Sequence, residues 1–71
     1  MTRDEVVELA TDMGWRANGK LRKYGRSFYQ CFRRGNHYLW IGHRFIERPG
    51  PGFPVTDFVS DGPLNVLRVL N

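Results

Sequence analysis

Three residues of the kind that bind metals, Cys31, His37 and His43, lie close together in the sequence. Zinc is usually held by cysteine and histidine side chains that converge on the ion at about 2.0–2.3 Å. Alternate side chains of a β-strand point to opposite faces, so we expect Cys31 to point away from both histidines. The histidines share a face but lie roughly 20 Å apart, at about 3.3 Å per residue. We therefore expect no metal site, and no motif indicates a cofactor.

His43 is also the residue best suited to acid–base catalysis, with Glu47 or Asp57 as its partner. A single histidine at the edge of a sheet is more often structural or exposed to solvent. We therefore predict no catalytic residue, and the remaining candidates for function are binding surfaces.

These residues belong to residues 27–46, SFYQCFRRGNHYLWIGHRFI, a segment rich in Phe, Tyr, Trp and Ile. Such residues favour strands, and Gly35-Asn36 in the middle is typical of a two-residue hairpin turn. A turn there fixes the register of the two strands. It pairs Arg34 with His37, Arg33 with Tyr38, Phe32 with Leu39, Cys31 with Trp40, and Phe28 with His43.

The register divides the hairpin into two faces. The more apolar face is expected in the core and carries Phe28, Gln30, Phe32, Leu39, Ile41 and Phe45, with His37 and His43 at its ends. The outer face is aromatic and basic and carries Tyr29, Cys31, Arg33, Tyr38, Trp40, Arg44 and Ile46.

The charge of the chain is unevenly distributed. The net charge is +4, but residues 16–48 contain nine Lys or Arg and only one acidic residue, Glu47, while the two ends together are acidic. Within residues 16–26, RANGKLRKYGR, a short strand and a mobile loop are both compatible with the sequence. A basic segment of this kind favours an anionic partner, although it could serve only to keep the protein soluble.

Helices are predicted at both ends. Thr2 and Glu5 form a capping-box pattern, an apolar stripe follows at Val6, Leu9, Ala10 and Met13, and Gly14 is a natural stop before Trp15. Near the other end, Ser60 or Asp61 is the expected cap, Pro63 begins the helix, and Leu64, Leu67 and Leu70 form its stripe, with Val66 beside it. Between the proline-rich residues 47–54 and this helix, residues 55–59 are expected to form a third strand.

The chain is therefore expected to be a single α+β domain, residues 1–71: a two-layer sandwich of an antiparallel β-hairpin or three-stranded sheet with N- and C-terminal helices. No apolar run approaches the roughly 20 residues of a membrane span, and one cysteine forms no internal disulfide, so we expect a cytoplasmic protein without a membrane partner. The expected core contains Val6, Leu9, Met13, Phe28, Phe32, Leu39, Ile41, Leu64 and Leu67.

Three short motifs carry a family resemblance: Gly14-Trp15 after the first helix, Gly25-Arg26-Ser27 before the hairpin, and Gly62-Pro63-Leu64 at the last helix. With this order of elements, the chain resembles the double-stranded-RNA-binding-domain-like fold and, within it, the HicA-type toxins, small ribonucleases of bacterial toxin–antitoxin pairs. The catalytic histidine of that family follows a glycine and a small residue where the first strand opens. Phe28 stands at that position here, so the resemblance implies a topology and assigns no catalytic residue.

Aromatic and basic side chains on an open sheet suit unpaired bases and phosphates. We therefore expect contact with nucleic acid, either RNA or single-stranded DNA. The alternatives are a small inhibitor or adaptor of a protein partner, of the type that phages and mobile elements encode, and third a HicA-like ribonuclease. The outer aromatics could instead be covered by the proline-rich loop or by the Trp15 segment and form a second small core. The expected binding residues are Lys20, Arg22, Lys23, Arg26, Tyr29, Arg33, Tyr38, Trp40 and Arg44.

Overall fold

A long antiparallel hairpin forms the centre of the structure, as the sequence predicts. In the computed structural model, which describes residues 1–71, its strands pair Arg34 with His37 and Phe32 with Leu39. Gly35 has a φ of 61°, which suits the first position of a tight hairpin turn. The expected register is therefore confirmed from the turn to the Cys31–Trp40 pair. The expected pair of Phe28 with His43 is absent, because β4 ends at Gly42 and the last pair is Tyr29 with Gly42.

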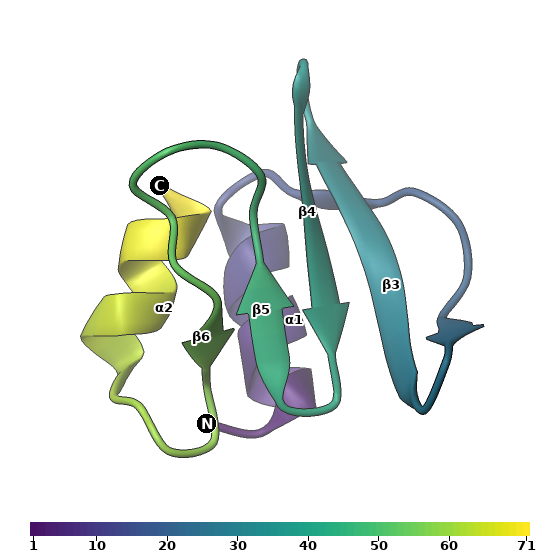
Figure 1. Ribbon diagram of the computed structural model, residues 1–71. Coiled ribbons are helices and arrows are strands. Elements are labelled where there is room, and N and C mark those ends of the chain that lie inside the picture. Colours follow the sequence, from purple (N-terminus) through teal and green to yellow (C-terminus); the bar gives the residue numbers. More distant parts are fainter.

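The complete fold has two helices and a six-stranded antiparallel sheet (Figure 1). In chain order the elements are α1 (Arg3–Asp12), β1 (Arg16–Ala17), β2 (Arg22–Tyr24), β3 (Ser27–Arg34), β4 (His37–Gly42), β5 (Phe45–Glu47), β6 (Thr56–Asp57) and α2 (Pro63–Leu70).

The sheet has more strands than the three expected at most, because the basic segment contributes two. Both β1 and β2 pair with β3, at opposite ends of that strand, and form one edge of the sheet. From β3 the order continues through β4 and β5 to β6. The two residues of β6 lie within the segment expected to form the third strand.

The second hairpin strand is shorter than expected, because the chain turns back after Gly42. This turn pairs Ile41 with Ile46 on β5. The residues after the turn therefore point to the opposite faces from those expected for a strand that continues past Gly42. Ile46, expected on the outer face, is fully buried, and Phe45, expected in the core, is exposed. Gly42 fits here because a Cβ would lie 2.8 Å from the Phe28 carbonyl oxygen.

Both helices lie on the same face of the sheet (Figure 1). The Thr2–Glu5 capping box is present, and α1 buries Val6 and Ala10. Gly14 has a φ of 93° and turns the chain so that Trp15 is buried and its Nε1–H donates a 3.0 Å hydrogen bond to the Leu70 carbonyl.

The apolar face of α2 differs from the expected one. Gly62 occupies the N-cap position, without a side-chain hydrogen bond, so neither Ser60 nor Asp61 caps the helix. Leu64 is 80% exposed, because the first turn of α2 presents it to solvent. The helix is held to the core by Val66, Val69 and Leu70, while Leu67 is half-buried.

The core lies between the helices and β3–β6. Phe28 was expected there but is 40% exposed, because the helices pack mainly against β4, β5 and β6 and leave that end of β3 uncovered. Phe58, just after β6, is fully buried and was not predicted. The buried apolar residues are Val6, Ala10, Trp15, Phe32, Leu39, Ile41, Ile46, Phe58, Val66, Val69 and Leu70, with Leu9 and Met13 partly buried against them. Neither helix has the length and apolar character needed to cross a membrane.

Candidate functional site

The face of the sheet that the helices leave open carries a cleft of about 570 Å³. Most of its lining is aromatic or aliphatic, with one acidic and one basic side chain. We call it the aromatic cleft. Its lining residues are Tyr24, Tyr29, Trp40, Glu47, Arg48, Pro49, Phe53 and Val55.

One wall of the aromatic cleft is set by strand pairing. Gly25, with a φ of 62°, begins the turn that places Tyr24 opposite Ser27 in the β2–β3 pair. Tyr24 is 54% exposed, and its ring packs edge-on against Tyr29 with the centroids 6.4 Å apart. Trp40 projects from β4 on the same face, because its register partner Cys31 has the same orientation as Tyr29. Three aromatic rings from three neighbouring strands thus form this wall.

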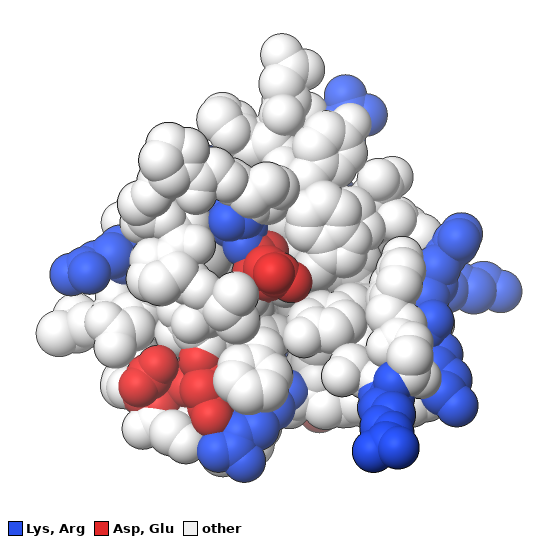
Figure 2. All heavy atoms as spheres, viewed as in Figure 1, with Lys and Arg blue, Asp and Glu red and all other residues white.

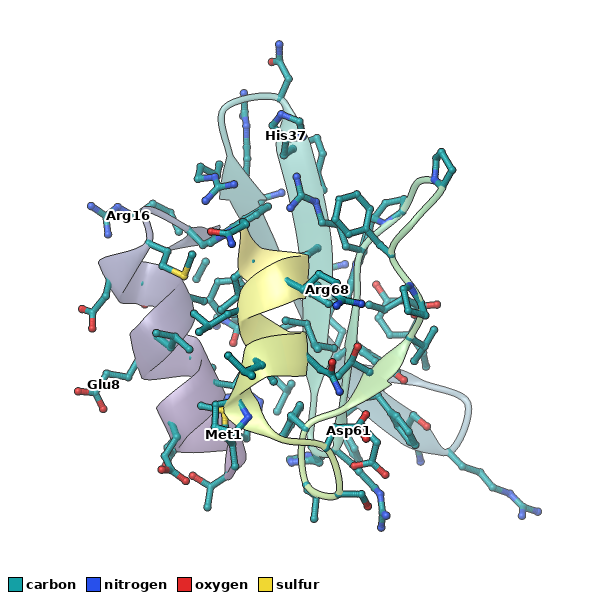
Figure 3. All side chains as sticks on the ribbon, turned by 90° about the vertical axis from the view of Figure 1, so that its left-hand side faces the viewer. Met1, Glu8, Arg16, His37, Asp61 and Arg68 are labelled. Carbon is teal, nitrogen blue, oxygen red and sulfur yellow. The ribbon has the colours of Figure 1, made fainter.

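The opposite wall is the proline-rich loop between β5 and β6. Figure 3 shows this green loop on the side of the sheet away from both helices. It contributes Pro49, Phe53 and Val55 to the lining. The loop borders the outer aromatics without filling the space between them, so it does not close them into a second core.

Arg48 fixes the start of this loop. It is only 8% exposed, and its Nη1 donates a 2.8 Å hydrogen bond to the Val69 carbonyl near the end of α2. The guanidinium lies 4.4 Å from the Phe53 ring centroid and 5.3 Å from that of Trp15. Burial, together with the nearby charge of Arg34, lowers the pKa of Arg48 from its ordinary value. Such a buried arginine remains charged, so it adds a positive group to the lining of the cleft.

A basic edge adjoins the cleft. Figure 2 shows Lys and Arg gathered along the right-hand side of the open face, where β2 lies, while its centre is uncharged around one acidic and one basic group. All four residues of the basic edge are exposed, and none forms an ion pair. They are Lys20, Arg22, Lys23 and Arg26.

Three other arginines of residues 16–48 are used within the protein, namely Arg34, Arg44 and Arg48. Arg34 donates hydrogen bonds to the Met13 and Asn71 carbonyls, at 3.2 and 2.6 Å, and its guanidinium stacks on Trp15. Arg44 forms the one ion pair of the structure, with its Nε 2.6 Å from Asp57 Oδ2. Much of the excess positive charge of the sequence is thus structural, and the basic edge is the group of unpaired cations beside the cleft. Arg16 on β1 is also exposed and unpaired but does not line the cleft.

The structure divides the expected binding residues into two groups. Tyr29 and Trp40 line the aromatic cleft, and the four residues of the basic edge lie beside it. The others lie outside. Arg33 donates a 2.7 Å hydrogen bond to the Gly35 carbonyl and stacks on Tyr38, and Arg44 is engaged by Asp57.

Six of the eight cleft residues were not among the expected binding residues: Tyr24, Glu47, Arg48, Pro49, Phe53 and Val55. The sequence Tyr24-Gly25-Arg26-Ser27 has the pattern of a two-residue turn with glycine first. That pattern would have placed Tyr24 beside Tyr29. No comparable signal exists for Phe53, because the path of a proline-rich loop does not follow from its composition.

The candidate metal ligands are separated in the fold. No three His, Cys, Asp or Glu side chains come together as a metal site requires. His43 packs edge-on against Phe28 with ring centroids 5.5 Å apart, and His37 Nδ1 lies 3.3 Å from Arg48 Nη2. Cys31 is half-buried in the middle of β3.

No protein-family model, no curated protein and no solved structure matches this chain. What the aromatic cleft binds must therefore follow from the residues that line it and from the charges beside it.

Proposed function

We propose that this protein binds single-stranded nucleic acid, with a base in the aromatic cleft and the phosphates along the basic edge. One observation carries this proposal: four unpaired cations lie on and around β2, the strand that also contributes Tyr24 to the cleft. Arg22 and Tyr24 project from the same side of β2, roughly 7 Å apart. A stacked base and its neighbouring phosphate would each meet a suitable side chain there.

The cleft has the size and lining for a nucleotide. Its volume of about 570 Å³ lies within the range of small-molecule sites, about 300–1,000 Å³. Tyrosine and tryptophan rings stack on bases of any sequence, and each stacked base contributes about 1–3 kcal/mol. Stacking requires a base whose face is free, so the proposal applies to single strands and not to duplexes.

A second candidate is a small inhibitor or adaptor that binds a protein. Glu47 favours it, because a carboxylate in the middle of the cleft is unusual next to phosphates. Tyr and Trp are also among the residue types that dominate the energy of protein interfaces. This reading predicts little affinity for any single strand at physiological salt.

Binding of a fluorescent eight-nucleotide thymidine DNA and of the matching uridine RNA, measured by anisotropy at low salt, tests the proposal. Tyr24→Ala should weaken binding by about 5- to 150-fold, which corresponds to the loss of one stacking contact. Tyr38→Ala is the matched control, because Tyr38 is also exposed but lies outside the cleft. We expect it to change the affinity by less than about twofold, a difference too small for a lost stacking contact.

Two results would contradict the proposal. If neither oligonucleotide binds at low salt, the protein-partner reading takes its place. If Tyr24→Ala and Tyr38→Ala weaken binding equally, the aromatic cleft is not the site. Thermal unfolding of both variants should match that of the wild type, since each removes an exposed ring.

A further inference from the structure

Glu47 is the single acidic side chain that lines the aromatic cleft. Its strand partner is Trp40, so the two side chains lie next to each other on the open face of the sheet. The residue is exposed and forms no ion pair. The neighbouring Arg48 forms no ion pair with Glu47, because its guanidinium donates hydrogen bonds to the Val69 carbonyl and to His37. Its positive charge still acts on the cleft that both residues line. The carboxylate oxygens of Glu47 are therefore free to accept hydrogen bonds from a ligand.

A carboxylate in the aromatic cleft repels phosphate and favours a ligand that has N–H donors. It can accept two parallel hydrogen bonds when two donors lie side by side. On its Watson–Crick edge, guanine has two such donors, N1–H and the N2 amino group. Adenine and cytosine each place their amino group beside an acceptor nitrogen, and thymine and uracil place N–H between two carbonyl oxygens.

On these grounds, and resting on the proposed function, we propose that the cleft selects an unpaired guanine through Glu47. Directly opposed side chains on neighbouring strands lie about 4.5–5.5 Å apart. A guanine stacked on the Trp40 ring would therefore bring its Watson–Crick edge within reach of the Glu47 carboxylate.

The positive charge of Arg48, the second charged group of the cleft, also favours guanine. Arg48 lines the same space, and its positive charge favours an acceptor atom, such as guanine O6, which adjoins N1–H. A cationic ligand would suit Glu47 and the surrounding rings but would be repelled by Arg48. The cleft thus presents an acceptor beside a positive group, which complements the donors and the carbonyl oxygen of guanine.

A set of thymidine octamers tests this inference, with guanine, inosine, adenine, cytosine or thymine at the fourth position. The wild-type protein should bind the guanine octamer about 5- to 150-fold more tightly than the all-thymine octamer, the range for one bidentate base contact. Inosine lacks the N2 amino group but keeps N1–H and O6, so its octamer should fall between the two. Adenine and cytosine octamers should bind more weakly than the guanine octamer.

Glu47→Gln separates the carboxylate from the rest of the cleft. The amide keeps one acceptor and adds a donor, so the variant should lose the guanine preference and bind the thymine octamer at least as well as the wild type. Glu8→Gln removes an acidic group from α1, on the opposite layer (Figure 3), and should leave the preference unchanged.

The outcomes distinguish the two proposals. Equal binding of guanine and thymine octamers by the wild type overturns the selection of guanine and leaves single-strand binding intact. A guanine preference that persists in Glu47→Gln overturns the role of Glu47. Failure of every octamer to bind at low salt overturns single-strand binding itself, and with it the inference.

Discussion

Arg48 at the end of β5 donates its Nη1–H to the Val69 carbonyl, at 2.8 Å, near the end of α2. One face of its guanidinium lies over Phe53 and it also contacts the Trp15 ring. The same side chain therefore joins the helical layer to the loop that forms one wall of the aromatic cleft. A cation near a helix C-terminus is also favoured by the helix dipole.

Replacing Arg48 should affect both layers. Arg48→Met keeps most of the apolar stem but leaves the Val69 carbonyl without its donor, so we expect the free energy of unfolding to fall by about 1.5–3 kcal/mol, the usual range for a hydrogen bond to a charged group. Urea denaturation measures this change. Arg68→Met on the exposed side of α2 is the control and should change the stability by less than about 0.5 kcal/mol. Equal effects of the two substitutions would contradict the structural role of Arg48.

Gly42, at the end of β4, leaves no room for a side chain beside β3. A Cβ at this position would meet the Phe28 carbonyl oxygen at 2.8 Å and the Tyr29 ring at 3.0 Å. Because a backbone oxygen cannot move aside easily, Gly42→Ala should destabilise the protein by about 1–3 kcal/mol. It should also weaken ligand binding, since Tyr29 lines the cleft.

Gly62→Ala is the matched control for Gly42→Ala. No atom lies within 4 Å of a Cβ built there, and its φ of −75° suits any residue. Alanine is a poorer N-cap than glycine, so a cost of about 0.5–1 kcal/mol is expected. Thermal or urea unfolding of both variants checks the pair, and a Gly42→Ala protein as stable as Gly62→Ala would show that the strands are not packed this closely.

The pair of Arg44 and Asp57 makes stability depend on acid pH. Desolvation raises the pKa of Asp57, but hydrogen bonds from Arg44 and from the Ser60 and Val59 backbone N–H groups outweigh it and hold the pKa below its ordinary value of 3.8. A carboxyl group whose pKa is lower in the folded state stabilises the fold above about pH 4, and this contribution disappears as the pH falls through the folded-state pKa.

Asp57→Asn removes this contribution. The variant should be less stable than the wild type at pH 7, and the difference should shrink as the pH is lowered toward 2. Urea midpoints measured over this range test the expectation. A difference that stays constant with pH would mean that the charge of Asp57 does not matter to stability.

The central hairpin could be predicted because two independent signals agree. Gly35-Asn36 supplies the turn, and the alternation of Phe32, Leu39 and Ile41 supplies the buried face. The turn after Gly42 could not be predicted in the same way, since His43-Arg44 has no turn preference. Because that turn was not predicted, Phe45 was expected in the core and Ile46 on the outer face, whereas Phe45 is exposed and Ile46 is buried.

Only half of the candidate site follows from sequence. Tyr29 and Trp40 follow from alternation along the hairpin. Glu47 and Phe53 depend on where β5 and the proline-rich loop lie, and this position is set by tertiary contacts of Arg48. The charge pattern also predicts a larger basic surface than the structure has. Sequence alone does not reveal that Arg34, Arg44 and Arg48 form hydrogen bonds or an ion pair with other groups of the protein.

The salt dependence of single-strand binding tests the central claim most directly. Each phosphate contact releases counterions, so log K against log salt concentration should fall with a slope of about −0.7 per contact. Arg22→Ala on the basic edge should flatten the slope by about one contact, while Arg68→Ala, which removes the same charge from α2 on the other side of the molecule (Figure 3), should leave it unchanged. Identical slopes for the two variants, or affinity that does not vary with salt, would contradict binding along the basic edge.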